Sequence, residues 1–155
     1  MQNYSKPIRR VDDASKRLIM ELLQGLNTYG FDVDSIFYIK QEDLWVVIEF
    51  LKTDHPTVRP STSHPNRYWH KNWRKFVSLW SLVQALGKAE LYLVNYEDKT
   101  HAEKQGRRER EFHVIKVRNV IPGEKGKLIE EESKTMNLEE IKKWYQTINQ
   151  KAKGG

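Results

Sequence analysis

The amino-acid sequence predicts an α/β (α+β) protein: a single domain whose mixed central β-sheet is flanked by an N-terminal helix, a long central helix and a C-terminal helix. Three observations favour this class. Apolar residues recur at helical spacing near both ends and in the middle of the chain. Short β-prone runs separate these segments. The length of 155 residues suits one domain with a real core, and the five Trp, seven Tyr and five Phe argue against a disordered chain.

The first half of the chain is predicted to form a helix, a hairpin and a second helix. In order, we expect a basic arm over residues 1–12, a helix over 13–29 stopped by Gly30, strands over 35–40 and 44–52, an irregular loop over 53–65 and a helix over 66–86. In the first helix, Leu18 and Leu22 mark an apolar stripe, and Glu21 lies beside it. The strand over 44–52 is nearly all apolar, as is typical of a strand buried on both faces.

The long helix over 66–86 carries two different side-chain patterns. An aromatic stripe recurs at three- and four-residue spacing, and a cationic stripe follows i, i+4, i+7 and i+8: Trp69, Trp73, Phe76, Trp80 and Val83, and Arg67, Lys71, Arg74 and Lys75 respectively. We interpret the aromatic stripe as core, with a stacking surface for nucleic-acid bases as the alternative. The cationic stripe is either a solvated helix face or a phosphate-binding surface.

The second half of the chain is predicted to complete the sheet. We expect a strand over 90–96, an exposed charged loop over 97–111, a half-exposed strand over 112–121, a short edge strand over 127–134 and a final helix that ends near residue 150. Asn137 looks like the N-cap of that helix, with Glu140 in the capping-box position. Arg59 in the irregular loop, and Arg107, Arg108 and Arg110 in the charged loop, are candidate phosphate contacts.

Composition limits the function. The net charge of +6, from 27 basic and 21 acidic residues, favours an anionic partner. Nucleic acid is the commonest partner of this kind, and we expect DNA. The absence of cysteine excludes disulfides and thiolate metal sites, and the five His lack zinc-ligand spacing. No apolar run approaches the ~20 residues of a membrane span, and the N-terminus lacks a secretory signal, so we expect a cytoplasmic protein. The oligomeric state stays open, a homodimer included.

The candidate site centres on acidic residues beside the two strands of the predicted hairpin. Asp34 precedes the first strand, and Glu49 and Lys52 end the buried second strand. This order of helix, acid, acid with lysine, basic helix and strand resembles the core of the PD-(D/E)XK nuclease superfamily over about Asp13–Tyr96. The resemblance implies a metal-dependent endonuclease that uses Mg²⁺ or Mn²⁺.

The resemblance also implies a role for each matching residue. Asp34 and Glu49 would bind the metal, Lys52 would orient the attacking water, and Glu21 would be an additional catalytic acid unless it is only a boundary residue of its helix. Hard divalent cations prefer such carboxylate oxygens and lower the pKa of a bound water.

Two features depart from the family pattern. Val33 replaces the proline, and the acid and lysine lie three residues apart instead of two. An undistorted strand would therefore point Glu49 and Lys52 to opposite faces. A bulge would restore the geometry, or Lys75 from the long helix would replace Lys52. The alternatives to a nuclease are a non-catalytic nucleic-acid-binding protein of the same fold and a protein-interaction accessory factor from a mobile element.

Overall fold

The computed structural model describes residues 13–154, and the chain divides into two compact units between Asp32 and Val33. The predicted basic arm over residues 1–12 lies outside the described residues. The first unit contains α1 (Asp13–Leu23), which is shorter than the predicted helix over 13–29. The helix ends early because Gln24 and Gly25, directly after Leu23, both take left-handed conformations, with φ of +49° and +82°. Gly25, and not Gly30, therefore follows its last turn.

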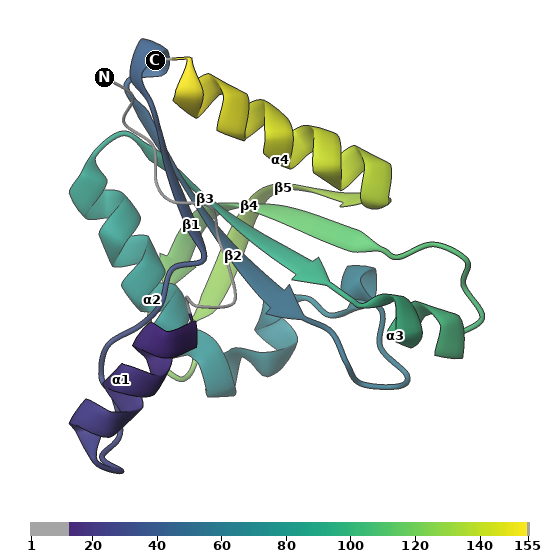
Figure 1. Cartoon of the computed structure of the whole chain (residues 1–155), viewed down its shortest axis with the longest axis horizontal. Helices are drawn as coiled ribbons and strands as arrows, with labels where there is room; N and C mark the ends of the chain where they lie inside the picture. The colour runs from purple at the N-terminus through teal and green to yellow at the C-terminus, as the bar shows by residue number, and fades with distance from the viewer. Residues whose placement is uncertain (1–12, 155) are drawn as a thin grey trace. The chain divides into compact units, whose positions relative to one another are not determined.

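The second unit is built on a five-stranded mixed sheet with strand order β1-β2-β3-β4-β5 (Figure 1). The strands are β1 (Ser35–Ile39), β2 (Leu44–Lys52), β3 (Ala89–Tyr96), β4 (Phe112–Ile121) and β5 (Lys127–Met136). The pair β2–β3 is parallel and the other three pairs are antiparallel. With four α-helices in residues 13–154, this is the predicted α+β class with a mixed sheet.

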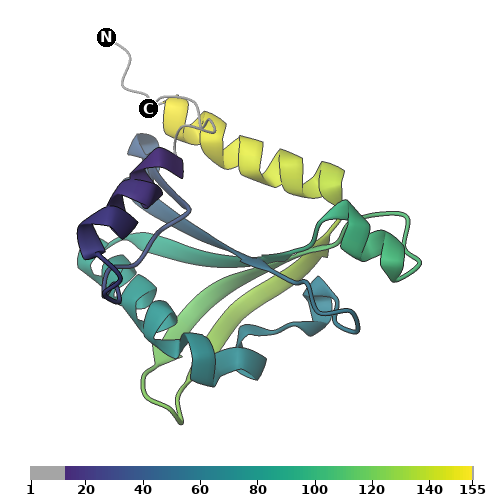
Figure 2. The same ribbon diagram turned by 60° about the horizontal axis from the view of Figure 1, so that its bottom comes forward.

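Two long helices cover the two faces of this sheet. Figure 2 shows α2 (Trp69–Leu86) on one face and α4 (Leu138–Lys153) on the other. The shorter elements are η2 (Lys40–Glu42), η3 (Pro60–Thr62), η4 (Pro65–Tyr68) and α3 (Lys99–Lys104). Because β2 and β3 are parallel, the chain must cross the sheet between them, and α2 forms that crossover. None of the helices in residues 13–154 has the length and hydrophobicity needed to cross a membrane.

Strand β2 lies between two hydrophobic cores, as its apolar sequence predicts. Val47 packs into the core on the α2 side, whereas Val46 and Ile48 pack into the core on the α4 side. The aromatic stripe of α2 also belongs to the first core, where Trp69 and Phe76 are buried. The interpretation of that stripe as core is therefore confirmed.

The start of α4 confirms the predicted capping box. The Asn137 side chain accepts a hydrogen bond from the Glu140 amide at 2.9 Å, and the Glu140 carboxylate accepts one from the Asn137 amide at 3.0 Å. The last turn carries Lys151 and Lys153, which complement the helix dipole.

Replacing the cap residue should weaken this helix. We expect Asn137→Ala to lower the free energy of unfolding by about 1 kcal/mol, because the Glu140 amide loses its acceptor. Thermal unfolding followed by circular dichroism should show a decrease in Tm of about 3 °C. Asn149→Ala, at an exposed position inside the same helix, is the matched control and should not lower Tm. Equal decreases in the two variants would contradict a capping role for Asn137.

The segment over 97–111 differs most from its prediction as an exposed charged loop. It contains α3, and Glu97, His101 and Glu111 in it are buried. Buried charges persist only when they are paired and hydrogen-bonded, and the partners of these residues come from positions far away in the sequence. The local absence of an apolar period therefore did not indicate burial.

Candidate active site

Glu49 is a buried acid on the face of β2 that α2 covers. Its residue is 2% exposed, and its Oε1 atom lies 2.8 Å from Nζ of Lys75 on α2. Within the described part of the chain, the Oε2 atom of Glu49 has no hydrogen-bond partner. A buried carboxylate oxygen without a hydrogen-bond partner costs free energy, and binding a ligand would remove that cost. The Oε2 atom of Glu49 is therefore available as a ligand, whereas Oε1 is already paired with Lys75.

Asp34 lies next to Glu49, directly before the neighbouring strand. It directly precedes β1, where Ser35 pairs with Ile48, so the backbone register places Asp34 opposite Glu49. The Asp34 Oδ2 atom accepts a hydrogen bond from the Phe50 amide at 2.8 Å, which fixes the carboxylate against β2. Two acids that are far apart in sequence are thus brought together at one end of the β1–β2 hairpin.

This environment changes the protonation of Glu49. Burial raises the pKa of the Glu49 carboxyl most, the Lys75 ammonium lowers it, and the nearby Asp34 raises it again, with a net value of about 7. At neutral pH the Glu49 carboxyl is therefore balanced between its neutral and ionised forms. A divalent cation between the two carboxylates would favour ionisation of both, because the ligands must be deprotonated to bind it.

Lys52 lies on the other face of the sheet. Strand β2 pairs with β3 in continuous register from Trp45↔Ala89 to Lys52↔Tyr96, so side chains alternate regularly along it. The Lys52 ammonium lies 3.5 Å from Asp98, at the start of α3, and both side chains are about half exposed. The structure therefore does not bring Lys52 to Glu49. It brings Lys75 there instead, which is the alternative that the sequence left open.

The other predicted residues of the first half of the chain are distributed over two units. Glu21 lies in α1 of the first unit, and its role as an additional acid stays a prediction. Of the cationic stripe, Arg67, Lys71 and Arg74 are exposed. The Arg67 guanidinium donates to the Thr62 carbonyl oxygen at 2.5 Å, and the Arg74 guanidinium lies 4.9 Å from the centroid of the Trp73 ring.

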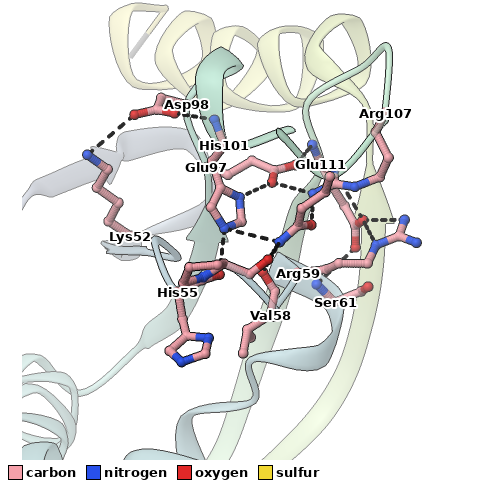
Figure 3. Close-up of polar contacts among 12 residues, drawn as sticks. Lys52, His55, Val58, Arg59, Ser61, Glu97, Asp98, His101, Arg107 and Glu111 are labelled. Atoms are coloured by element: carbon pink, nitrogen blue, oxygen red, sulfur yellow. Dashed lines mark hydrogen bonds and ion pairs between the residues drawn. The ribbon is translucent and has the colours of Figure 1, made fainter. Parts of the chain in front are cut away.

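Arg59 and Arg107 bind the buried acids of a charge network that the sequence did not predict (Figure 3). Glu97, which is fully buried, accepts hydrogen bonds from both terminal nitrogens of Arg107, from the Glu111 amide at 2.8 Å and from Nδ1 of His101 at 2.6 Å. Glu111 accepts from Arg59 at 2.6 and 2.8 Å and from the Ser61 amide at 2.9 Å. The charges of Arg59 and Arg107 are thus largely neutralised within the fold.

This network attaches the irregular loop to the end of the sheet. His101 Nε2 donates to the His55 carbonyl oxygen at 2.8 Å, and the Asn95 amide donates to the carbonyl oxygens of Pro60 and Ser63. Both ring nitrogens of His101 thus face oxygen acceptors, and the Gln105 side-chain nitrogen lies 3.3 Å from Nε2 of the same ring. Burial would lower the pKa of His101, but the bonds to the His55 carbonyl and to Glu97 raise it.

Arg108 and Arg110 occupy a different environment from Arg107. Arg108 is exposed, and the Arg110 guanidinium lies 5.5 Å from the centroid of the Phe112 ring. Both line an open groove that extends to Asn137 at the start of α4. Within that groove they lie beside Glu109 and Glu140, so the local charge is mixed, and their predicted phosphate-binding role stays a prediction.

A metal site here would depend on two acids. Among residues 13–154, no group of three or more His, Cys, Asp or Glu side chains is arranged to hold a metal ion. Mg²⁺ often uses only one or two carboxylates together with waters and substrate phosphates, so Asp34 and Glu49 are a sufficient set. Comparison with protein-family models, with curated proteins and with solved structures finds no match to this chain.

Proposed function

We propose that this protein is a cytoplasmic, metal-dependent phosphodiesterase that acts as a nuclease, with Asp34 and Glu49 as metal ligands and Lys75 as the site's lysine. One observation carries the proposal. The buried Glu49 has an Oε2 atom without a hydrogen-bond partner among the described residues, its other oxygen binds Lys75, and Asp34 lies beside it. A purely structural ion pair has no need of a second acid that raises the pKa of Glu49.

The chain's own residues suit this chemistry. When bound, Mg²⁺ or Mn²⁺ would activate a water and neutralise charge on the phosphate. Glu49 and Asp34 hold oxygen ligands in fixed positions, since the former is packed under α2 and the latter is bonded to the β2 backbone. Lys75 reaches the site from α2 with its side chain 37% exposed, so its ammonium can contact both Glu49 and a phosphate. The exposed Arg67 and Lys71 would hold the substrate backbone beside it.

A non-catalytic nucleic-acid-binding protein is the second candidate. The Lys75–Glu49 ion pair favours it, because the pair neutralises the acid without any metal. Calorimetric titration with Mn²⁺, followed by cleavage of plasmid and oligonucleotide substrates, separates the two candidates. Metal binding with cleavage supports the nuclease, and the absence of metal binding at pH 8 contradicts it.

The two lysines provide a paired test of the site. We expect Lys75→Met to reduce Mn²⁺-dependent cleavage about 10²-fold or more, because the group that positions and polarises the water is lost. Lys52→Met is the matched control and should cleave like the wild type, since Lys52 pairs with Asp98 on the opposite face. Initial rates at pH 8 with saturating Mn²⁺ measure both effects. A larger loss in Lys52→Met than in Lys75→Met would contradict the assignment of Lys75.

A further inference from the structure

Three apolar residues on the α2 side of the sheet lie outside both hydrophobic cores. Ile36 and Tyr38 on β1 are 46% and 38% exposed, and Trp45 on β2 is partly exposed. The register pairs Ile36 with Val47 and Tyr38 with Trp45, and Val47 packs into the core on the α2 side. The three side chains therefore share the face of the sheet that carries Glu49.

These residues continue the row that begins at the candidate site. Asp34, Ile36 and Tyr38 are two residues apart, so their side chains project from the same face of the strand. At about 3.4 Å per residue, Tyr38 lies about 14 Å from Asp34 along β1. An aromatic pair is therefore placed a few nucleotides away from the two acids.

The aromatic pair is held rigidly. The rings of Tyr38 and Trp45 have centroids 4.8 Å apart and an interplanar angle of 39°. The Tyr38 hydroxyl donates to Oδ1 of Asp43 at 2.8 Å, which fixes the ring at the start of β2. Because the side chains are ordered before binding, a base that stacks on them would lose little of its binding energy to ordering the protein.

The cations of α2 lie on the other side of the acids. Trp45 pairs with Ala89, and its amide bonds to the Lys88 carbonyl oxygen at 3.0 Å, so the end of α2 is near Trp45. The helix therefore runs antiparallel to β2, and because Lys75 meets Glu49, its first turns lie further from Trp45 than Glu49 does. Lys71 is one turn before Lys75 on the same side of α2. The order along this face is Lys71, then the acids with Lys75, then Ile36, then the aromatic pair.

We propose that the substrate of this site is single-stranded nucleic acid, whose bases stack on Tyr38 and Trp45 while a backbone phosphate contacts Lys71. The inference rests on the proposed function, which places the scissile phosphate at Asp34, Glu49 and Lys75. Stacking on a protein aromatic ring needs a base face that is free, and single strands offer such faces whereas the bases of an intact duplex cover one another. A cationic groove side with aromatic platforms is the usual combination for single strands.

Binding measured without cleavage tests the inference. We would follow the fluorescence anisotropy of a labelled 12-nucleotide dT strand and of a hairpin duplex of equal length, in buffer with EDTA. Wild type should bind the single strand at least about tenfold more tightly than the duplex. Tyr38→Ala should weaken single-strand binding about tenfold, and Tyr38→Phe, which keeps the ring, should retain most of the affinity. Lys71→Ala should reduce the slope of log affinity against log salt concentration by about one released ion. Lys143→Ala, on α4 at the other face of the sheet, should leave that slope unchanged.

The outcomes separate the inference from the proposed function. Tighter duplex binding, or a Tyr38→Ala variant with unchanged Tm that binds the single strand like the wild type, would overturn the inference. If Mn²⁺-dependent cleavage of duplex is observed as well, only the single-strand inference is contradicted, and the proposed nuclease function is still supported. Conversely, single-strand binding that depends on Tyr38 and Lys71 supports the single-strand surface, and a lack of Mn²⁺ binding then contradicts only the catalytic part.

Discussion

Glu49→Gln is expected to abolish Mn²⁺ binding and to reduce cleavage by at least about 10³-fold, while the protein stays folded. The amide keeps the size of the side chain but cannot supply an anionic ligand, so several kcal/mol of transition-state stabilisation by the metal are lost. Calorimetric Mn²⁺ titration and single-turnover cleavage at pH 8 measure the two effects. Glu124→Gln, at an exposed position, is the control and should behave like the wild type.

The same variant should be more stable than the wild type at high pH. The folded pKa of Glu49, about 7, lies above the ordinary 4.5, so the folded state binds this proton more tightly than the unfolded state. The protonated Glu49 carboxyl contributes this stability to the folded state in full below pH 4.5, and the contribution is lost as the pH rises through 7. Glutamine does not titrate, and Lys75 can turn to solvent. We therefore expect the free energy of unfolding of Glu49→Gln at pH 8 to exceed that of the wild type by up to about 3 kcal/mol. This figure follows from about 1.4 kcal/mol for each pKa unit.

Urea unfolding at pH 4.5 and pH 8 checks this prediction. The stability difference between Glu49→Gln and wild type should grow between the two pH values. A variant that is equally destabilised at both would show that Glu49 serves only as a structural partner of Lys75. Loss of activity together with gain of stability is the result that a functional acid predicts, because burial of such a charge is unfavourable for folding.

Glu97→Gln is expected to lower the free energy of unfolding by about 3–5 kcal/mol, the largest loss that we predict for a single side chain. The substitution leaves Arg107 and His101 buried without the carboxylate that they share. Urea unfolding at pH 6 measures the loss, and limited proteolysis within residues 53–65 should accelerate, because the loop is attached through His101 and Glu111. Glu103→Gln, on the exposed side of α3, should change the stability by less than about 0.5 kcal/mol.

The pH dependence of this network has a defined sign. Burial alone would raise the pKa of Glu97, but the bonds from Arg107 and His101 outweigh it and lower that pKa. The ionised Glu97 carboxylate thus stabilises the folded protein above pH 4.5, and this contribution is lost as the pH falls through the lowered pKa of Glu97. For His101, whose pKa is raised, the stability is present below pH 6.5 and is lost as the pH rises through its folded value. In Glu97→Gln this pH dependence should be weaker, and an unchanged profile would contradict the assignment.

Several elements of the fold follow from local patterns alone. The strands over 44–52 and 112–121 and the capped start of the last helix agree with the structure because alternation, apolar runs and a capping box act between near neighbours. The first helix was predicted too long because Gly25 and the later Gly30 offer the same local signal, and of these two glycines only Gly25 has a positive φ.

The α+β class and the buried strand β2 can be predicted from the amino-acid sequence, which also offers the acids at positions 34 and 49 as candidates for chemistry. Which lysine meets Glu49 depends on the packing of distant elements. An uninterrupted strand sends Lys52 to the opposite face, and the packing of α2 brings Lys75 to within 2.8 Å. The charged segment over 97–111, which was predicted as an exposed loop, likewise forms the network around the buried Glu97. The physical reason is the same in both cases: the partners of a buried charge are selected by packing across the sheet, and sequence distance carries no information about it.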